Sequence, residues 1–145
     1  MEKSKIQDHI KNLMSSWEES LSKKDIATLL DDYDEGIVLF DVGAQFTGKE
    51  EYRKIWEACF PYFGEKIGTE RKDVEIHVCD DMAVVHGYSR LTGMDSTSDM
   101  AHSWLRTTVC YKKVADQWKD FHEHVSLPVD CEKEKPVYIL DSDSE

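Results

Sequence analysis

The first third of the chain carries apolar residues at helical spacing. Between residues 4 and 22 they recur every three or four positions, which predicts one amphipathic helix of about five turns. Asp25 is a candidate cap for a second, short helix over residues 26–33. A third apolar stripe begins after Gly48 and predicts a helix that ends near Pro61.

Beyond residue 70 the pattern changes to an alternation of polar and apolar residues. It predicts four strands at residues 74–78, 82–92, 101–113 and 118–127, after an earlier short strand at 37–41. Tight turns between the later strands favour an antiparallel meander. The expected fold class is therefore α+β, with three N-terminal helices followed by a curled antiparallel sheet.

The length of 145 residues fits one domain, which we expect to cover residues 1–128. Residues 129–145 form an acidic C-terminal tail that ends in DSDSE. We expect this tail to be partly disordered, because an acidic segment with few apolar residues buries little surface.

Charge and cysteine usage narrow the function classes. The net charge of −12 argues against nucleic-acid and anionic-membrane partners, which attract basic proteins. No apolar run is long enough to span a bilayer, and the N-terminus resembles no signal peptide. Four cysteines stand far apart without a CxxC pair, which is typical of reduced thiols. We expect a cytoplasmic protein.

Large residues occupy both faces of the last two predicted strands. Three helices can cover only one face, so we expect a second subunit to cover the outer face and form a homodimer. The face expected to lie inside is polar for a core, and its members are His102, Arg106, His122, His124 and Ser126. Polar groups persist inside a protein when they bond one another or a ligand. We therefore expect a ligand pocket.

The chain resembles the nuclear transport factor 2-like superfamily over residues 3–128. The resemblance rests on residues 33–48, residues 106–118 and the final-strand sequence WKDFHEHVS at 118–126. This superfamily includes SnoaL-like polyketide cyclases and ketosteroid isomerases. The final strand is also similar to that of the calcium/calmodulin-dependent protein kinase II association domain. The resemblance implies a cone-shaped α+β barrel, with the three helices packed in the concave face of the sheet.

The resemblance also suggests proton-transfer residues. Asp41 stands near the position of the isomerase's general base, and it alternatively ends a strand with its carboxylate bound by turn amides. His124 is a second proton-transfer candidate. Arg106 is a candidate anchor for an anionic substrate, or a structural partner of Asp41 or Asp120. The isomerase uses a tyrosine of its first helix, where this chain has Trp17, so we do not expect steroid isomerisation.

Further candidates would line the pocket. The predicted ligand-binding residues are Arg106, His86, His122, Trp56, Trp104 and Tyr33. His122 and His124, two residues apart on one strand, suggest zinc together with His86, but the sequence does not establish a third ligand beside the strand pair, and the superfamily usually works without metal. We therefore expect no metal and no cofactor.

These observations predict a small-molecule-binding protein with a conical pocket. Its chemistry would be cofactor-independent acid–base catalysis of the isomerase, cyclase or dehydratase type. The alternative is a non-catalytic association module that works through the outer face of the sheet, and a third possibility is a plain carrier.

Overall fold

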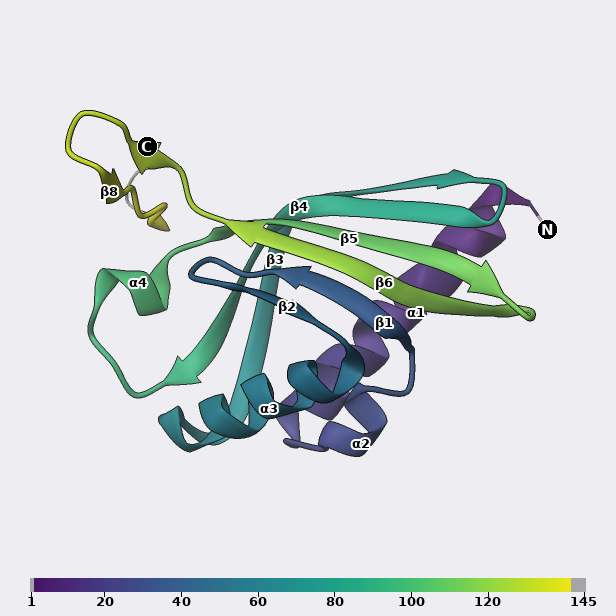
Figure 1. The fold of residues 1–145 in the computed structure, drawn as a ribbon, viewed down its shortest axis with the longest axis horizontal. Helices are drawn as coiled ribbons and strands as arrows, with labels where there is room; N and C mark the ends of the chain where they lie inside the picture. Colours follow the sequence, from purple (N-terminus) through teal and green to yellow (C-terminus); the bar gives the residue numbers. More distant parts are fainter. Residues whose placement is uncertain (1, 142–145) are drawn as a thin grey trace.

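Helices and strands alternate in the first half of the chain and strands dominate the second half (Figure 1). The computed structural model describes residues 2–141. Its helices are α1 (Lys3–Ser22), α2 (Ile26–Leu29), α3 (Lys49–Cys59), the 3₁₀ turn η1 (Phe60–Tyr62) and α4 (Asp99–His102). Its strands are β1 (Tyr33–Phe40), β2 (Gln45–Thr47), β3 (Phe63–Cys79), β4 (Met82–Met94), β5 (Leu105–Val114), β6 (Gln117–Ser126), β7 (Val129–Asp130) and β8 (Lys135–Pro136).

Six strands form one curved sheet in the order β2-β1-β6-β5-β4-β3. Figure 1 shows α1, α2 and α3 on one side of this sheet, which confirms the expected α+β class with the helices on the concave face. The neighbours β1 and β6 run parallel, so the sheet is mixed rather than wholly antiparallel. Because these two strands run in the same direction, their carboxyl ends meet at one edge of the cone.

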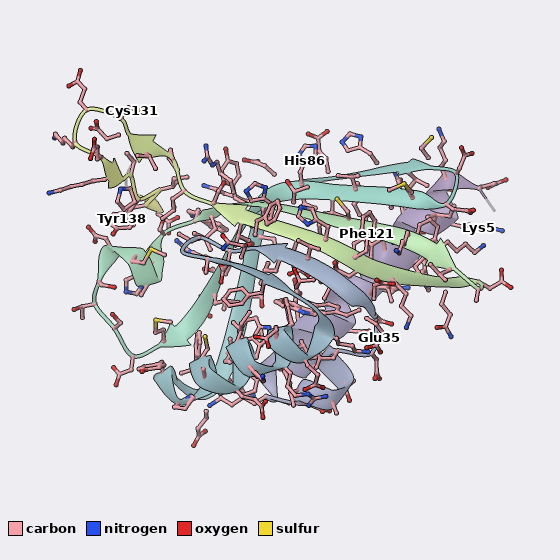
Figure 2. The ribbon with its side chains drawn as sticks, in the orientation of Figure 1. Lys5, Glu35, His86, Phe121, Cys131 and Tyr138 are labelled. Atoms are coloured by element: carbon pink, nitrogen blue, oxygen red, sulfur yellow. The ribbon has the colours of Figure 1, made fainter. Side chains whose placement is uncertain are left out.

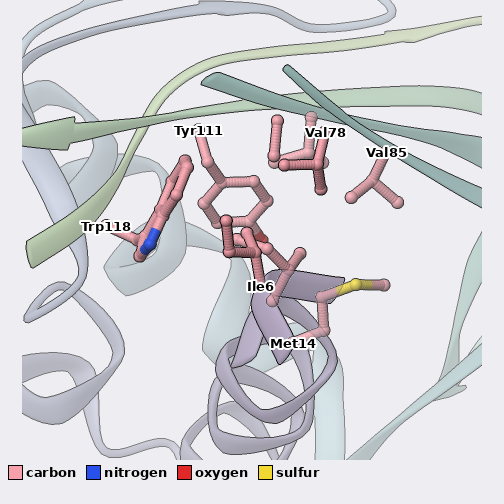
Figure 3. Packing of buried hydrophobic residues seen from close by; sticks show 9 residues of the cluster. Ile6, Met14, Val78, Val85, Tyr111 and Trp118 are labelled. Carbon is pink, nitrogen blue, oxygen red and sulfur yellow. The ribbon is translucent and has the colours of Figure 1, made fainter. Parts of the chain in front are cut away.

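The apolar stripe of α1 packs on the inner face of the sheet. Figure 3 shows Ile6 and Met14 of α1 against Val85, Tyr111 and Trp118 of three strands. The predicted helix face is therefore the buried one, and the hydrophobic burial of these side chains holds α1 across the sheet. Among the described helices, none is both long and apolar enough to cross a membrane.

Two β-bulges change which residues face the cone. In β3 the register shifts between Lys72 and Glu75, so one extra residue opposes Gly87 of β4. A Cβ atom on Gly87 would lie 3.0 Å from the carbonyl oxygens of Lys72 and Asp73, so a larger residue there would push against the bulged backbone. The second bulge, at Phe121 of β6, adds one residue opposite the Cys110–Tyr111 step of β5. Each bulge reverses the alternation of inward and outward side chains beyond it.

The described part of the C-terminal tail folds back on the sheet. Strands β7 and β8 pair, and the Trp104 amide donates to the carbonyl of Ile139 at 2.8 Å. The Trp104 indole donates to Asp141, and Arg90 lies 4.2 Å above the indole ring. The tail is thus anchored at least to residue 141. Of the expected disordered end, residues 142–145 lie outside the described residues.

Replacing Gly93 with alanine is expected to lower the free energy of unfolding by about 1–3 kcal/mol. Gly93 has a φ of +97°, and a Cβ atom there would collide with the carbonyl oxygen of Lys66. Gly43→Ala is the matched control, because nothing lies within 4 Å of its added Cβ. Chemical denaturation of both variants measures the difference. Equal stability of the two variants would contradict the steric argument.

Candidate functional site

A cavity of about 470 Å³ lies between the helices and the inner face of the sheet. Its wall is mainly apolar and includes Leu39, Ile55, Trp56 and Val125. Polar groups from several elements also reach the wall, and the ones that matter below are Trp17 of α1, Tyr33 at the start of β1, Asp41 just after its end, Tyr52 of α3, and Asp120 and Glu123 of β6. A concave, mainly apolar space with a few converging polar groups is typical of a small-molecule site.

Four of these groups form one hydrogen-bond cluster, in which the two tyrosines are buried and the other two residues are half-buried. The Trp17 indole donates to the Tyr33 hydroxyl at 2.7 Å. The hydroxyls of Tyr33 and Tyr52 lie 2.7 Å apart. Each of them lies beside one carboxyl oxygen of Glu123, at 3.0 Å for Tyr33 and 2.9 Å for Tyr52. We call Trp17, Tyr33, Tyr52 and Glu123 the tyrosine–glutamate cluster.

The cluster needs one more hydrogen than its phenols supply. Tyr33, Tyr52 and Glu123 make three mutual contacts, and each contact needs a hydrogen, while the two phenols provide two. Burial raises the pKa of Tyr33 and of Tyr52 well above 10, and the nearby Glu123 charge raises both further, so both remain neutral donors. The two phenol hydrogens therefore fill two of the three contacts, and the third contact lacks a hydrogen of its own.

Asp120 is the carboxyl group that keeps a proton. Its side chain is fully buried, and burial raises its pKa well above the ordinary value of 3.8. The charge of Glu123 and a hydrogen bond between the two carboxyls raise the pKa further. Its Oδ1 atom is buried without a hydrogen-bond partner among the described residues. A pair of close carboxyls that shares one proton can both donate and accept, as acid–base catalysis requires.

Asp41 lies in the cavity wall where β1 ends. Its amide donates to the carbonyl of Ala44, and its Oδ1 accepts from the Val42 amide at 2.8 Å. Asp41 therefore ends a strand, as one interpretation of the sequence expected, and also faces the cavity. The register pairs Leu39 with Glu123, and Asp41 is two residues further on the same face. Strand spacings put the Cα atoms of Asp41 and Glu123 roughly 8 Å apart.

Of the residues that the sequence suggested for the pocket, Asp41, Tyr33 and Trp56 lie in the cavity wall. The five others do not line it. Arg106 is exposed and donates to the Ser126 hydroxyl, and His122 binds the carbonyl of Val38. His124 is exposed beside the ring of Phe40. His86 stacks on His77, and Figure 2 shows it on the side of the sheet away from the helices.

Trp104 is the fifth residue outside the cavity. It lies beneath the C-terminal tail, where its ring contacts Arg90 and its indole nitrogen binds Asp141. The prediction that the polar face of the last strands lines the cone is therefore wrong. In β5 the inward residues are Leu105, Thr107, Val109 and Tyr111.

The bulge at Phe121 explains the error. Trp118 and Asp120 face inward as even-numbered residues, but past the bulge the inward positions are Glu123 and Val125. Strict alternation through β6 therefore puts His122 and His124 inside and Glu123 outside, the reverse of the structure. The sequence does carry a signal of the shift, because the bulky apolar residues of this strand move from even positions to odd ones at Val125 and Leu127.

Sequence reasoning missed the three groups that define the site. Tyr52 lies in the helix predicted after Gly48, but it was not singled out as a hydrogen-bonding group. Asp120 was considered only as a partner for Arg106, and Glu123 was not among the residues expected inside. A glutamate two residues before the inward Val125 would have indicated the site once the shift in β6 was recognised.

Comparisons with known proteins identify the relatives of this chain. The profile of the SnoaL-like domain family matches residues 10–130. A solved NTF2-like protein of unknown function from Pseudomonas putida KT2440 is 28% identical, with a TM-score of 0.83 over 96% of this chain and 98% of that one. No curated protein matches the sequence.

Two more distant structures share the fold. One is a candidate dehydratase of the NTF2-like family from Streptomyces avermitilis, at 17% identity and a TM-score of 0.66, over 82% of this chain and 93% of that one. The other is a candidate ketosteroid isomerase from Shewanella frigidimarina NCIMB 400. It is 20% identical, with a TM-score of 0.67 over 79% of this chain and 92% of that one. At these identities the likeness shows the fold alone.

Proposed function

Because this chain belongs to the SnoaL-like domain family, we propose that its cavity binds a small, mainly apolar molecule and moves a proton on it without a cofactor. The reaction would be of the isomerase, cyclase or dehydratase type. One observation carries the proposal, namely the carboxyl pair Asp120–Glu123, held by two buried phenols and facing an apolar cavity. A carboxyl pair held in this way can both give a proton to a ligand and take one back.

The wall groups divide into a proton acceptor and a proton donor. Asp41 is the proposed acceptor, which takes a proton from a carbon next to a carbonyl group of the ligand. The Asp120–Glu123 pair is the proposed donor, which returns a proton or hydrogen-bonds the oxygen that gains negative charge. Tyr33 and Tyr52 position Glu123 through their hydrogen bonds. A ligand lying along the wall between Asp41 and Glu123 would meet both groups.

The charges in the wall favour an uncharged ligand. Both arginines of the wall are already paired, Arg71 with Glu18 and Arg90 with Glu70 and Asp141. Neither is free to neutralise an anionic substrate without losing a partner. This differs from the role first suggested for Arg106, which does not line the cavity.

Replacing Asp41 with asparagine is expected to slow proton abstraction by about 100- to 10,000-fold, since the amide cannot accept the proton. The assay is proton NMR in deuterium oxide, which follows deuterium entering the α-carbon of neutral bicyclic ketones such as 2-tetralone. Asp116→Asn is the matched control, because Asp116 is fully exposed in a turn. Binding without exchange in the unmodified protein would indicate a carrier. If Asp41→Asn loses neither ligand binding nor deuterium exchange, Asp41 has no part in the mechanism.

We also propose that the protein is a cytoplasmic homodimer that associates through the outer face of the sheet. The helices cover the other face, and Phe40 is 43% exposed on the outer face, where its ring contacts His122 and His124. The four cysteines are free thiols, which suits a reducing compartment. Sedimentation equilibrium at micromolar concentration tests the dimer, and a monomer there would remove it. A larger ring would favour the association module instead.

A further inference from the structure

Two histidines and a glutamate converge on the outer face of the β3–β4 hairpin. Glu75 of β3 pairs directly with His86 of β4. His77 lies two residues beyond Glu75, so its side chain is on the same face. The bulge in β3 determines this arrangement, since it puts Ile76 and Val78 against the core and turns Glu75 and His77 outward. Figure 2 shows His86 on this outer side, away from the helices and the cavity.

The donor atoms of these three residues point at one small volume. The two Nε2 atoms of His77 and His86 lie 3.0 Å apart, and their rings are nearly parallel at 15° with centroids 5.0 Å apart. One ligand atom from each of Glu75, His77 and His86 lies within 4.8 Å of the other two. No ion is needed to account for the contact itself, because one Nε2–H can donate to the other Nε2.

The spacing also suits two bonds to one metal ion. At metal–nitrogen distances of about 2.0–2.1 Å, nitrogens 3.0 Å apart subtend an angle of about 94° at the metal. A separation of about 3.3 Å would open this angle to the tetrahedral value, which needs only a small rotation of the exposed His77 ring relative to the half-buried His86 ring. The glutamate oxygen then supplies a third ligand and a negative charge, and water can fill the remaining positions.

The chemistry of the donors selects the class of ion. Imidazole nitrogen suits zinc, copper and nickel, whereas magnesium and calcium prefer oxygen ligands. Binding requires a lone pair from both Nε2 atoms, so the ring that now donates must carry its proton on Nδ1 instead. This is a change of tautomer through solvent and leaves both rings neutral. The net charge of −12 further favours a cation.

We propose that Glu75, His77 and His86 form a binding site for a divalent transition-metal ion, with zinc as the probe ion. The site is separate from the cavity, and of the three histidines that suggested zinc in the sequence it contains His86 alone. His122 and His124 do not join it. The ring of Phe40 contacts both of them, and their own ring centroids lie 6.3 Å apart.

The test is calorimetric titration of the full chain with zinc chloride after treatment with a chelator. We expect one ion per chain. His77→Ala and His86→Ala are each expected to weaken binding by at least about 100-fold, and Glu75→Gln by about 10-fold. The matched controls His122→Ala and His124→Ala remove a histidine pair from the same face and should leave zinc binding unchanged. Magnesium should give no saturable heat.

A second readout separates this site from scattered surface binding. Zinc should shift the imidazole NMR signals of His77 and His86 and leave those of His9 in place. Circular dichroism of each variant checks that it folds, and His77→Gln replaces His77→Ala if it does not. The proposal is overturned if zinc does not saturate at one ion per chain, or if the His77 and His86 variants bind it as tightly as the unmodified protein.

Discussion

Replacing Asp120 with asparagine is expected to make the protein more stable at neutral and alkaline pH, although it removes a buried hydrogen-bonding group. The Asp120 carboxyl is fully buried beside Glu123, and both burial and that neighbouring charge raise its pKa well above 3.8. An asparagine has nearly the same shape, needs no charged form, and can donate a hydrogen bond to Glu123 from its amide nitrogen. The substitution therefore removes a cost that rises with pH.

The direction of the pH dependence follows from proton binding. In the folded protein Asp120 keeps its proton above pH 4, whereas in the unfolded chain it loses the proton at its ordinary pKa. The folded state therefore binds more protons in this range, and the contribution of Asp120 to stability is greatest below the unfolded pKa. As the pH rises from there towards the folded pKa, the free energy of unfolding falls by up to about 1.4 kcal/mol per pH unit.

Urea denaturation of both proteins at several pH values between 4 and 8 measures this effect. We expect the stability difference between Asp120→Asn and the unmodified protein to grow steadily with pH in favour of the variant. Asp116→Asn, which changes a fully exposed carboxylate, should follow the unmodified protein within about 0.5 kcal/mol. The opposite trend, in which the variant loses stability relative to the unmodified protein between pH 4 and pH 8, would show that Asp120 is ionised in the folded state.

Sequence reasoning identified the helices and strands in which apolar residues repeat regularly because one face of the element is buried. The stripe of α1 and the alternation at Ile76 and Val78 were confirmed, because the first half of that stripe packs in the same core cluster as these two strand residues. Strand β3 begins at Phe63, well before the predicted residue 74, since its first half is charged and gives no clear alternation. Tyr33 was expected in a helix, yet it opens β1 because the chain there pairs with β6, a contact made 87 residues later along the chain (120 minus 33).

The site was harder to predict than the fold. Which face of β6 lines the cavity depends on one inserted residue, Phe121, and the sequence marks this bulge only by the move of apolar residues to odd positions at Val125 and Leu127. The histidines drew attention because polar residues stood out on an otherwise regular strand, while Glu123 looked like an ordinary exposed acid. The parallel pairing that brings Asp41 near Glu123 depends on long-range topology, which local patterns do not specify.

Replacing Val125 with tryptophan is expected to abolish ligand binding in the cavity while leaving the assembly state intact. Val125 faces the cavity two residues after Glu123. The register that pairs Phe40 with His124 puts Val125 beside Asp41, one residue further along. An indole at this position would fill the space between the proposed proton acceptor and donor. Filling existing space costs less than overpacking a tight core, for which about 1–3 kcal/mol is usual.

The measurement is quenching of Trp17 and Trp56 by 2-naphthol, since both indoles lie in the cavity wall. We expect its affinity to fall by more than about 100-fold, or about 2.8 kcal/mol of binding free energy. The new indole adds to the fluorescence, so calorimetry with the same naphthol provides a second readout. Deuterium entry into the ketones should stop in the same variant.

The matched control is Thr108→Trp, which adds the same ring to β5 at an outward position, opposite His86 and His124. It should leave naphthol binding unchanged and should weaken a dimer formed through the outer face. If the protein is an association module, the two variants should have the opposite effects: Thr108→Trp should abolish assembly, and Val125→Trp should leave the function unchanged. If both variants bind naphthol as the unmodified protein does, the molecule binds outside the cavity, and the acid–base proposal loses its site.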